Sequence, residues 1–369
     1  RVTEADFPHV LPGETAAISL PLNVPKNGRA YLKITYLLKQ GDSLRPVEHE
    51  LGFDEILLNN EDGRNQTSLK WRAEAAAKAL TLPPLTLEEN DRQLIISGKA
   101  FTYVYDKRTG TFSRLTVDGK DFLDRPMEIN IWRAPTDNDA PIKEKWTKAM
   151  YHLARSRAYT TDYSLTDEAA EIRSHMAMTA IGVQPMMTMD AIWTIHKDGQ
   201  MDLNMAVTRD MEFPALPRFG LRLFLPESVN QVTYYGLGPN ESYIDKCRAS
   251  YHGRFESRVK DLHEDYLKPQ ENGSHADCDY VMVESPTAGL KAFSGNRFSF
   301  NASVFTQEEL TEKKHAYELK SCGSTVLNLD FRQNGIGSNS CGPELLKKYR
   351  FDEETFTYSI NLILETGKD

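Results

Sequence analysis

The sequence predicts an all-β protein, and three features of its 369 residues support this. Apolar and polar residues alternate with period two, most clearly at 201–208 and 356–364, as in strands with one buried face. Turn pairs such as Asp118-Gly119 and Asp198-Gly199 separate these runs. Helical patterns are scarce, and strands and helices nowhere alternate as a (β/α)₈ barrel requires. We expect more than about 40% strand and less than about 12% helix, against an average helix content of ~30–35%.

Residues 1–72 predict a small β-unit that is only part of a sandwich. Four strands are expected, at residues 16–22, 30–39, 47–58 and 68–71. An immunoglobulin-like sandwich needs about seven strands, so this unit is incomplete. Residues 73–79 are rich in alanine and fit either a short helix or a strand that leads into a linker. The extended stretch Leu82-Pro83-Pro84-Leu85 then predicts a boundary between two domains, residues 1–82 and 83–369.

The second part predicts a large double-sheet domain with one helix. A hairpin is expected over residues 101–117, closed by Lys107-Arg108-Thr109-Gly110, because glycine takes the positive φ of a tight turn. The helix is expected within residues 140–157, with Asp139 as its N-cap. One apolar stripe supports it, formed by Ile142, Trp146, Met150 and Leu153.

The bulk composition excludes several classes of protein. The formal net charge is −9 and no basic stripe is visible, which excludes a typical nucleic-acid binder and disfavours an acidic membrane surface as partner. No apolar run reaches the ~18 residues that a membrane span needs. The chain starts at Arg1 without a methionine or a signal peptide, so we expect the native N-terminus to be missing. The compartment therefore stays open between cytoplasm and periplasm.

The cysteines predict free thiols, and one disulfide is the alternative. They are Cys247, Cys278, Cys322 and Cys341. Their number is too small for a disulfide scaffold, and none stands in a CxxC or CxxH spacing. The histidines likewise lack an HxxxH or HExxH spacing, so we expect no metal site.

Two polar segments hold candidate binding residues. Residues 132–139 read Trp-Arg-Ala-Pro-Thr-Asp-Asn-Asp, in which Arg133, Asp137 and Asn138 suit sugar hydroxyls or a cation. The same residues also fit a turn held by Asx hydrogen bonds and an Arg–Asp pair that leads into the helix. In the turn Pro269–Gly273, Glu271 is either a general acid or hydroxyl-binding carboxylate, or a hydrogen-bond partner within the turn.

A third candidate is the loop after Gly335-Ile336-Gly337. It reads Ser338-Asn339-Ser340-Cys341-Gly342-Pro343 and joins two predicted strands. Loops carry binding residues more often than core segments do. No base stands near Cys341 in the sequence, so the pattern gives little support for a thiol nucleophile.

Taken in order, these motifs resemble the C-terminal region of the family 2 β-galactosidases. Each motif is short, but together they follow the order of the family. The resemblance covers residues 88–369 well and residues 1–72 more loosely. The segments that carry it are 105–110 (Tyr-Asp-Lys-Arg-Thr-Gly), 132–139, 236–243, 269–273, 300–303 and 335–337.

The resemblance implies a partial immunoglobulin-like β-sandwich followed by a large antiparallel, galactose-mutarotase-like supersandwich. In this family the parent enzyme hydrolyses terminal, non-reducing β-D-galactose residues with retention, using two glutamates on a (β/α)₈ barrel N-terminal to this region. We therefore expect no catalytic residue, metal or cofactor in this chain, and Mg²⁺ and Na⁺ belong to the parent's catalytic domain. The implied partners are a β-galactoside or other carbohydrate and the rest of a homo-oligomeric parent.

The resemblance also implies that a loop of this chain lies at the rim of the parent's active site. The family places an active-site loop after Gly-Ile-Gly, and some members carry a tryptophan there that stacks on the substrate. Asn339, Ser340 and Cys341 stand at this place, which leaves open whether Cys341 replaces an aromatic platform. Together with Arg133, Asp137, Asn138 and Glu271, they are the predicted substrate-binding residues.

Two other functions remain open. One is a free-standing carbohydrate-binding sandwich, and the incomplete first unit argues against it. The other is an aldose epimerase of the mutarotase type, for which His252 or His275 with Glu271 would supply the acid and the base.

Overall fold

The computed structural model describes residues 8–26, 28–61, 66–337, 340 and 342–367. The chain divides into two compact units, residues 1–63 and 64–369. Strands make up 48% of the structure and helices 13%, which confirms the all-β prediction. The helix content lies slightly above the predicted limit because a helix forms where a strand was expected at 68–71.

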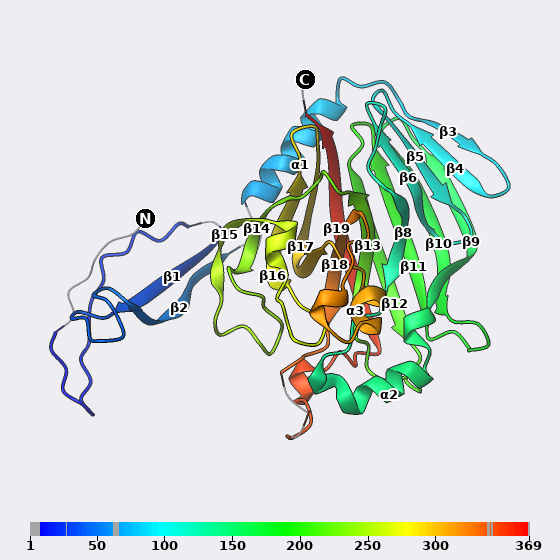
Figure 1. Ribbon diagram of the computed structural model, residues 1–369. Coiled ribbons are helices and arrows are strands. Elements are labelled where there is room, and N and C mark those ends of the chain that lie inside the picture. The colour runs from blue at the N-terminus through cyan, green and yellow to red at the C-terminus, as the bar shows by residue number, and fades with distance from the viewer. Residues whose placement is uncertain (1–7, 27, 62–65, 338–339, 341, 368–369) are drawn as a thin grey trace. The chain divides into compact units, whose positions relative to one another are not determined.

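In the first unit, the described strands form one antiparallel hairpin (Figure 1). β1 spans Gly28–Leu37 and pairs with β2, Glu50–Glu61, which confirms two of the predicted strands. The strand predicted at 16–22 is wrong. These residues are mostly exposed, and no described strand pairs with them, so their backbone groups have no ladder to join.

The first described element of the second unit is α1, Gln66–Ala79, which replaces the strand predicted at 68–71. Its alanines are strong helix formers. Trp71 packs edge to face on Tyr280 and Phe293, with ring centroids 5.1 and 5.7 Å apart. This contact joins the helix to the large sheet, so the compact units divide before α1. The boundary predicted between residues 82 and 83 lies after α1, and that domain assignment stays a prediction.

A small antiparallel sheet follows, with its five strands paired in chain order. They are β3 Thr86–Glu89, β4 Gln93–Ser97, β5 Phe101–Asp106, β6 Thr111–Val117 and β7 Lys120–Asp121. β5 and β6 form the predicted hairpin. Gly110 in its turn has a φ of +74°, the conformation for which glycine was expected.

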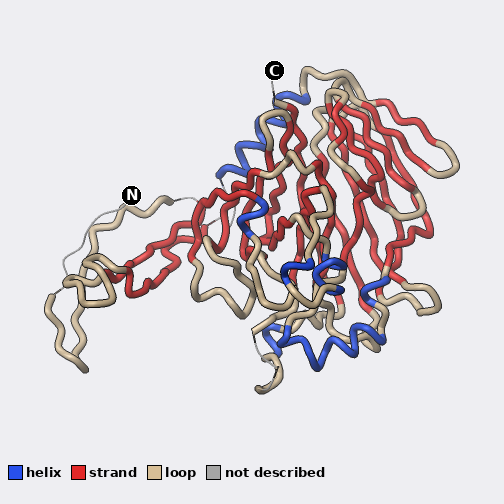
Figure 2. The backbone as a smooth tube through the Cα atoms, in the orientation of Figure 1, coloured by secondary structure: helices blue, strands red, loops and turns tan. Residues whose placement is uncertain are grey.

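The remaining strands form a twelve-stranded antiparallel sheet (Figure 2). They are β8 Arg125–Asn130, β9 Arg155–Leu165, β10 Ala169–Thr179, β11 Met187–His196, β12 Met201–Arg209, β13 Arg218–Pro226, β14 Gln231–Gly238, β15 Tyr251–Arg258, β16 Ser274–Glu284, β17 Ala288–Ser303, β18 Ser324–Gln333 and β19 Thr355–Thr366. The main path is β15-β14-β16-β17-β19-β12-β11-β10-β9, while β13 pairs with β8 and β18. Burial alternates along β12, which confirms the period-two prediction there.

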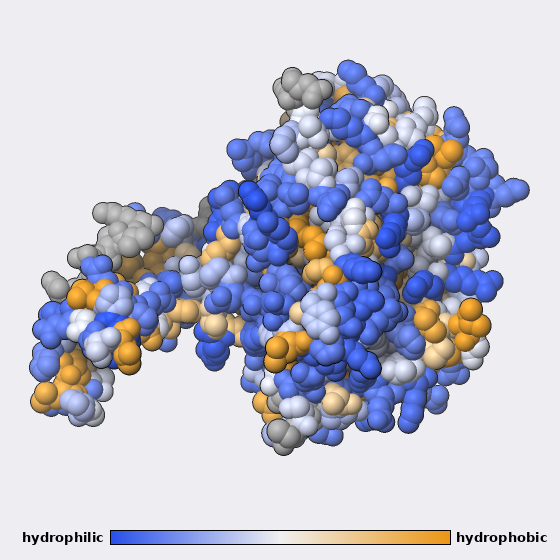
Figure 3. Space-filling view, in the orientation of Figure 1, coloured by the Kyte–Doolittle hydropathy of each residue, from blue (hydrophilic) through white to orange (hydrophobic). Residues whose placement is uncertain are grey.

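The two sheets share one apolar core. Phe112 of β6 meets Trp193 of β11 edge to face, with ring centroids 5.1 Å apart. Tyr103 and Tyr105 are buried, and their hydroxyls bind the Gly199 carbonyl at 2.9 Å and Ser174 Oγ at 2.8 Å. Burying these rings costs little because both hydroxyls are paired. On the face in Figure 3, hydrophilic side chains predominate and apolar ones are scattered.

The large sheet branches at β17. Residues 288–293 pair with β19, whereas residues 299–303 pair with β18. β16 pairs along both halves of β17, with shifts of register on either side of Cys278. The branch thus interrupts the regular hydrogen-bond ladders of the sheet.

Short helices lie in the connections. α2, Ala140–Lys148, confirms the predicted helix, and its Trp146 is buried with the indole N–H 2.7 Å from the Ala215 carbonyl. The predicted stripe ends early, because Met150 has a φ of +60° and Leu153 is 49% exposed. α3 spans Gln307–Glu312, and 3₁₀ turns lie at 137–139, 151–153, 259–262, 316–318 and 347–349. No helix among the described residues is long and apolar enough to cross a membrane.

We expect Trp71→Ala to lower the free energy of unfolding by about 3 kcal/mol or more, because the indole fills a site among Tyr280, Phe293 and Ile363. Urea unfolding followed by circular dichroism measures this loss. Lys70→Ala is the control, since Lys70 is exposed and its Nζ lies 3.7 Å from the exposed Glu74. It should change the free energy by less than about 0.5 kcal/mol. Equal losses in both variants would contradict a dependence of α1 on the Trp71 contact.

Candidate functional site

Five of the six motifs, all except 105–110, meet in the second unit around a buried polar cluster. We define this cluster as Arg133, Asp139, Arg218, Glu271 and Asp330, whose side chains are at most 4% exposed. Charges this deeply buried persist only where partners satisfy them. The cluster joins segments 132–139 and 269–273 to the end of β18.

Arg218, on β13, bridges two buried carboxylates. Its Nε lies 3.0 Å from Asp330 Oδ1, its Nη2 binds Asp330 Oδ2, and its Nη1 lies 3.0 Å from Glu271 Oε1. Burial raises the pKa of both Glu271 and Asp330, and the positive charge of Arg218 opposes that increase. One guanidinium therefore holds together two strands and the segment 269–273.

Arg133 links the first motif to the chain that follows β18. Its Nη2 lies 2.7 Å from Asp139 Oδ1, and its Nε lies 3.2 Å from Asp139 Oδ2. The same guanidinium donates to the carbonyls of Asn334 and, at 3.1 Å, of Gly335. Asp139 stands at the N-cap position of α2, but its carboxylate binds Arg133 and the Thr136 N–H, so the predicted side-chain cap does not form.

Asp245 holds the start of the loop at Gly335-Ile336-Gly337. Its carboxylate accepts hydrogen bonds from the N–H groups of Ile336 at 2.9 Å and Gly337 at 2.7 Å. Asn138 donates from Nδ2 to the Ile336 carbonyl at 2.7 Å. A Cβ on Gly335 would lie 2.6 Å from Asp245 Oδ2, so the close approach requires glycine. We define residues 335–337 as the loop base.

The segment 269–273 connects motifs 236–243 and 300–303 to the cluster. The Glu271 N–H donates to the Ala134 carbonyl at 3.0 Å, which ties the segment to the first motif. Two further hydrogen bonds reach residues of motifs 236–243 and 300–303: Gly273 N–H to Glu241 Oε2 at 2.8 Å, and Asn301 Nδ2 to the Asn272 carbonyl at 2.6 Å. Motifs that are far apart in the sequence thus form one hydrogen-bonded network.

The predicted substrate-binding residues lie in different environments. Arg133 and Glu271 are buried in the cluster and bind protein groups. Asp137 is exposed with Lys268 Nζ at 3.6 Å, and Asn138 is half-buried. Ser340 is exposed, whereas Asn339 and Cys341 lie outside the described residues. Contact of these residues with a sugar stays a prediction.

A cavity of about 310 Å³ opens beside the loop base. Its volume lies within the ~300–1,000 Å³ typical of small-molecule sites. The lining includes Asn138, Lys145, Gly335, Glu344 and Arg350. Asn138 therefore faces a space that a ligand can enter, unlike Arg133 and Glu271.

The two histidines considered as acid–base groups have partners other than Glu271. His252 Nε2 lies 2.8 Å from Asp277 Oδ2, and His275 Nδ1 lies 3.0 Å from the Tyr234 hydroxyl. Burial lowers the pKa of His275 to about 4. In the part of the chain that the structure describes, no three His, Cys, Asp or Glu side chains are grouped to hold a metal ion. Cys247, Cys278 and Cys322 are free thiols, as predicted.

Comparison with known proteins finds similar sequences along almost the whole chain. Residues 97–362 match the family model described as "Beta galactosidase small chain". A β-galactosidase of Actinobacillus pleuropneumoniae is 38% identical, covering 95% of this chain and 34% of that protein. One of Staphylococcus xylosus is 32% identical, with 98% and 35% covered, so the chain spans about a third of these curated relatives. A solved galactose 1-epimerase from Lactobacillus acidophilus NCFM is similar over 78% of this chain and 100% of its own, with a TM-score of 0.44 and 9% identity.

Replacing Arg218 with methionine leaves Glu271 and Asp330 buried without their counter-ion. We expect a loss of about 3–5 kcal/mol in the free energy of unfolding at neutral pH. Because burial raises the folded-state pKa of both carboxyls, protonation favours the folded form. The loss should therefore be largest at about pH 8 and shrink towards about pH 4.5, where the carboxyls take up protons.

Urea titrations at both pH values measure this effect. Arg254→Met is the matched control, because Arg254 and its partner Glu256 are 58% and 63% exposed. This variant should lose less than about 1 kcal/mol at either pH. A loss for Arg218→Met that is small, or that grows on acidification, would contradict the assigned role of Arg218.

Proposed function

This chain belongs to the β-galactosidase small-chain family, and we propose that it forms the non-catalytic C-terminal part of a β-galactosidase. The extent of the sequence matches supports this proposal, because β-galactosidases match 95–98% of the chain over only 34–35% of their own length. The complete enzyme then hydrolyses terminal, non-reducing β-D-galactose residues with retention. Under this proposal the partners are a β-galactoside and the rest of a homo-oligomeric enzyme, without nucleic acid or membrane.

The chemistry of a retaining glycosidase supports a catalytic site outside this chain. Such an enzyme needs an acid/base carboxyl and a nucleophilic carboxylate about 5–5.5 Å apart, both open to the substrate. Glu271 and Asp330 are close to each other, but they share Arg218 and are 1% and 0% exposed. We therefore propose that the chain shapes the active site of the parent and that other residues catalyse the reaction.

The proposed contribution of the chain is the loop that follows the loop base. Arg133, Asn138 and Asp245 bind the backbone of residues 335–337, so the loop base is held in a fixed position. A fixed start lowers the entropy lost when loop side chains order around a sugar. Arg133 and Glu271 are then positioning residues, while Asn339, Ser340 and Cys341, together with Asp137 and Asn138, face the substrate.

The isolated 369-residue chain is expected to release no nitrophenol from a nitrophenyl β-galactoside, because the proposed carboxyl pair lies outside it. The chain should be purified from a host that lacks its own β-galactosidase, with the full-length enzyme as positive control. Turnover that co-purifies with the chain from such a host would contradict the proposal.

In the full-length enzyme, Asn339→Ala and Cys341→Ala are each expected to raise KM or lower kcat, by at most about tenfold, since one hydrogen bond to a sugar contributes ~0.5–1.5 kcal/mol. Asn296→Ala, at an exposed position of β17, is the control and should leave both constants unchanged. Unchanged kcat and KM with a lower Tm would mean that the loop is only structural. Cys341→Trp gives an independent test, because a stacking face at this position should lower KM.

A further inference from the structure

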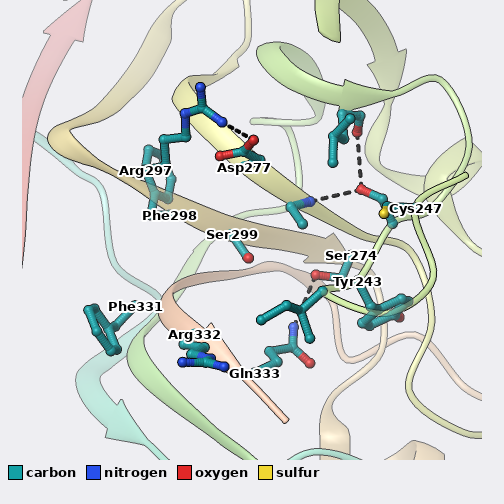
Figure 4. A pocket seen from close by; sticks show the side chains of 14 residues that line it. Tyr243, Cys247, Ser274, Asp277, Arg297, Phe298, Ser299, Phe331, Arg332 and Gln333 are labelled. Carbon is teal, nitrogen blue, oxygen red and sulfur yellow. Dashed lines mark hydrogen bonds and ion pairs between the residues drawn. The ribbon is translucent and has the colours of Figure 1, made fainter. Parts of the chain in front are cut away.

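A second cavity, of about 330 Å³, lies in the second unit at the branch of the large sheet (Figure 4). Asp277 of β16 and Arg297 of β17 form part of one wall, and residues 331–333 of β18 form part of another. Its lining residues differ from those of the cavity beside Asn138. The volume falls within the ~300–1,000 Å³ range of small-molecule sites.

Three strands interrupt their regular pairing at this cavity. In β16 the register shifts between His275 and Cys278, and Asp277 adopts a left-handed φ of +57°. In β18 the register against β13 shifts after Asp330, so residues 331–333 all reach the cavity. Between these strands, β17 changes partner from β19 to β18. Bulges and left-handed non-glycine residues recur at binding sites, where they direct side chains that a regular strand would turn away.

Two buried polar atoms of the lining residues have no hydrogen-bond partner among the described residues. One is Arg332 Nε, a donor, and the other is Gln333 Oε1, an acceptor. Buried polar atoms are nearly always paired, so this adjacent donor and acceptor suggest a ligand. A hydroxyl group both donates and accepts, so a hydroxyl can pair with either atom.

The charged side chains of the lining are paired, one of them with a carboxylate outside the lining. Arg297 pairs with Asp277, and Arg332 pairs with Glu353. An anionic ligand would meet the Asp277 carboxylate, and a cationic one would meet the guanidinium groups of Arg297 and Arg332. Phe298 and Phe331 add apolar surface to the same cavity. The lining thus favours a neutral molecule that has several hydroxyls and an apolar face.

We propose that this cavity binds a neutral monosaccharide of hexose size. Its hydroxyls donate to Asp277 and Gln333 and accept from Arg297 and Arg332, while its C–H face lies against a phenylalanine ring. The site is made by this chain alone and needs no catalytic domain. Its binding is measured without turnover, so the inference stands or falls independently of the proposed role of residues 338–342.

The test is isothermal titration of the 369-residue chain with D-galactose and with D-glucose. We expect a dissociation constant on the order of 1 mM for at least one sugar. Asp277→Asn should weaken binding at least tenfold, and Ser299→Leu, which fills the cavity, should abolish it. Asp190→Asn is the matched control, because Asp190 binds His175 at 2.7 Å as Asp277 binds His252 at 2.8 Å. Melting curves establish that each variant is folded.

A second measurement uses Cys247, a partly exposed thiol in the cavity lining. Bound sugar should slow its alkylation by iodoacetamide, as read for this peptide by mass spectrometry. Three results would overturn the proposal: no saturable heat with either sugar at concentrations on the order of 100 mM, equal affinity in the folded Asp277→Asn and Ser299→Leu variants, or tighter binding of the anion D-galactonate than of D-galactose.

Discussion

The guanidinium of Arg218 lies between the carboxylates of Glu271 and Asp330, and the second unit depends on this buried bridge. The three residues come from β13, from its sheet partner β18 and from the turn before β16. The three side chains are only 0–1% exposed. Removal of one charge would therefore leave the remaining charges uncompensated in a medium of low polarity. The bridge therefore holds Asp330 of β18 and the turn that carries Glu271 against β13.

β18 and the residues after it connect the cluster, the cavity and the loop base. Asp330 belongs to the polar cluster, and residues 331–333 line the cavity at the sheet branch. Asn334 and Gly335 then accept hydrogen bonds from Arg133, and Asp245 binds the next two N–H groups. Eight consecutive positions, 330–337, thus take part in three neighbouring structures, so a change in one of them acts on the others through a single short stretch of backbone.

Local patterns predicted much of the fold, because the interactions that form a hairpin or a short helix are close in sequence. The alternation in β12, the hairpin at 101–117 and the helix α2 are examples. The sequence pattern predicted a strand at 68–71, where the structure has α1. The alanine-rich stretch that follows was ambiguous on its own, and Trp71 of this helix contacts Tyr280, which is distant in the sequence. Residues 16–22 fit a strand pattern, but among the described residues they have no neighbour with which to pair.

The site was harder to predict than the fold because its contacts are long-range. Arg133 and Glu271 stood out in short motifs, and the structure shows them buried in a cluster with Arg218, which no motif contained. Asp245 lies 91 positions from Ile336, and Arg218 lies 112 positions from Asp330. At such separations, a single sequence gives no indication that these residues are in contact. Only the pairing of β13 with β18 and the turn after β14 bring these side chains to their partners.

Hydrogen exchange at the amides of Ile336 and Gly337 tests most directly whether the buried cluster and Asp245 hold the loop base. In the isolated chain at neutral pH we predict slow exchange at both amides, because each donates to the Asp245 carboxylate. Asp245→Asn, which keeps the shape but loses one acceptor oxygen, should speed exchange at these two amides at least about tenfold. Glu171→Gln, in an ion pair on β10, should leave them unchanged. Exchange in the unmodified chain as fast as at Ile181, a fully exposed turn residue, would contradict a fixed loop base.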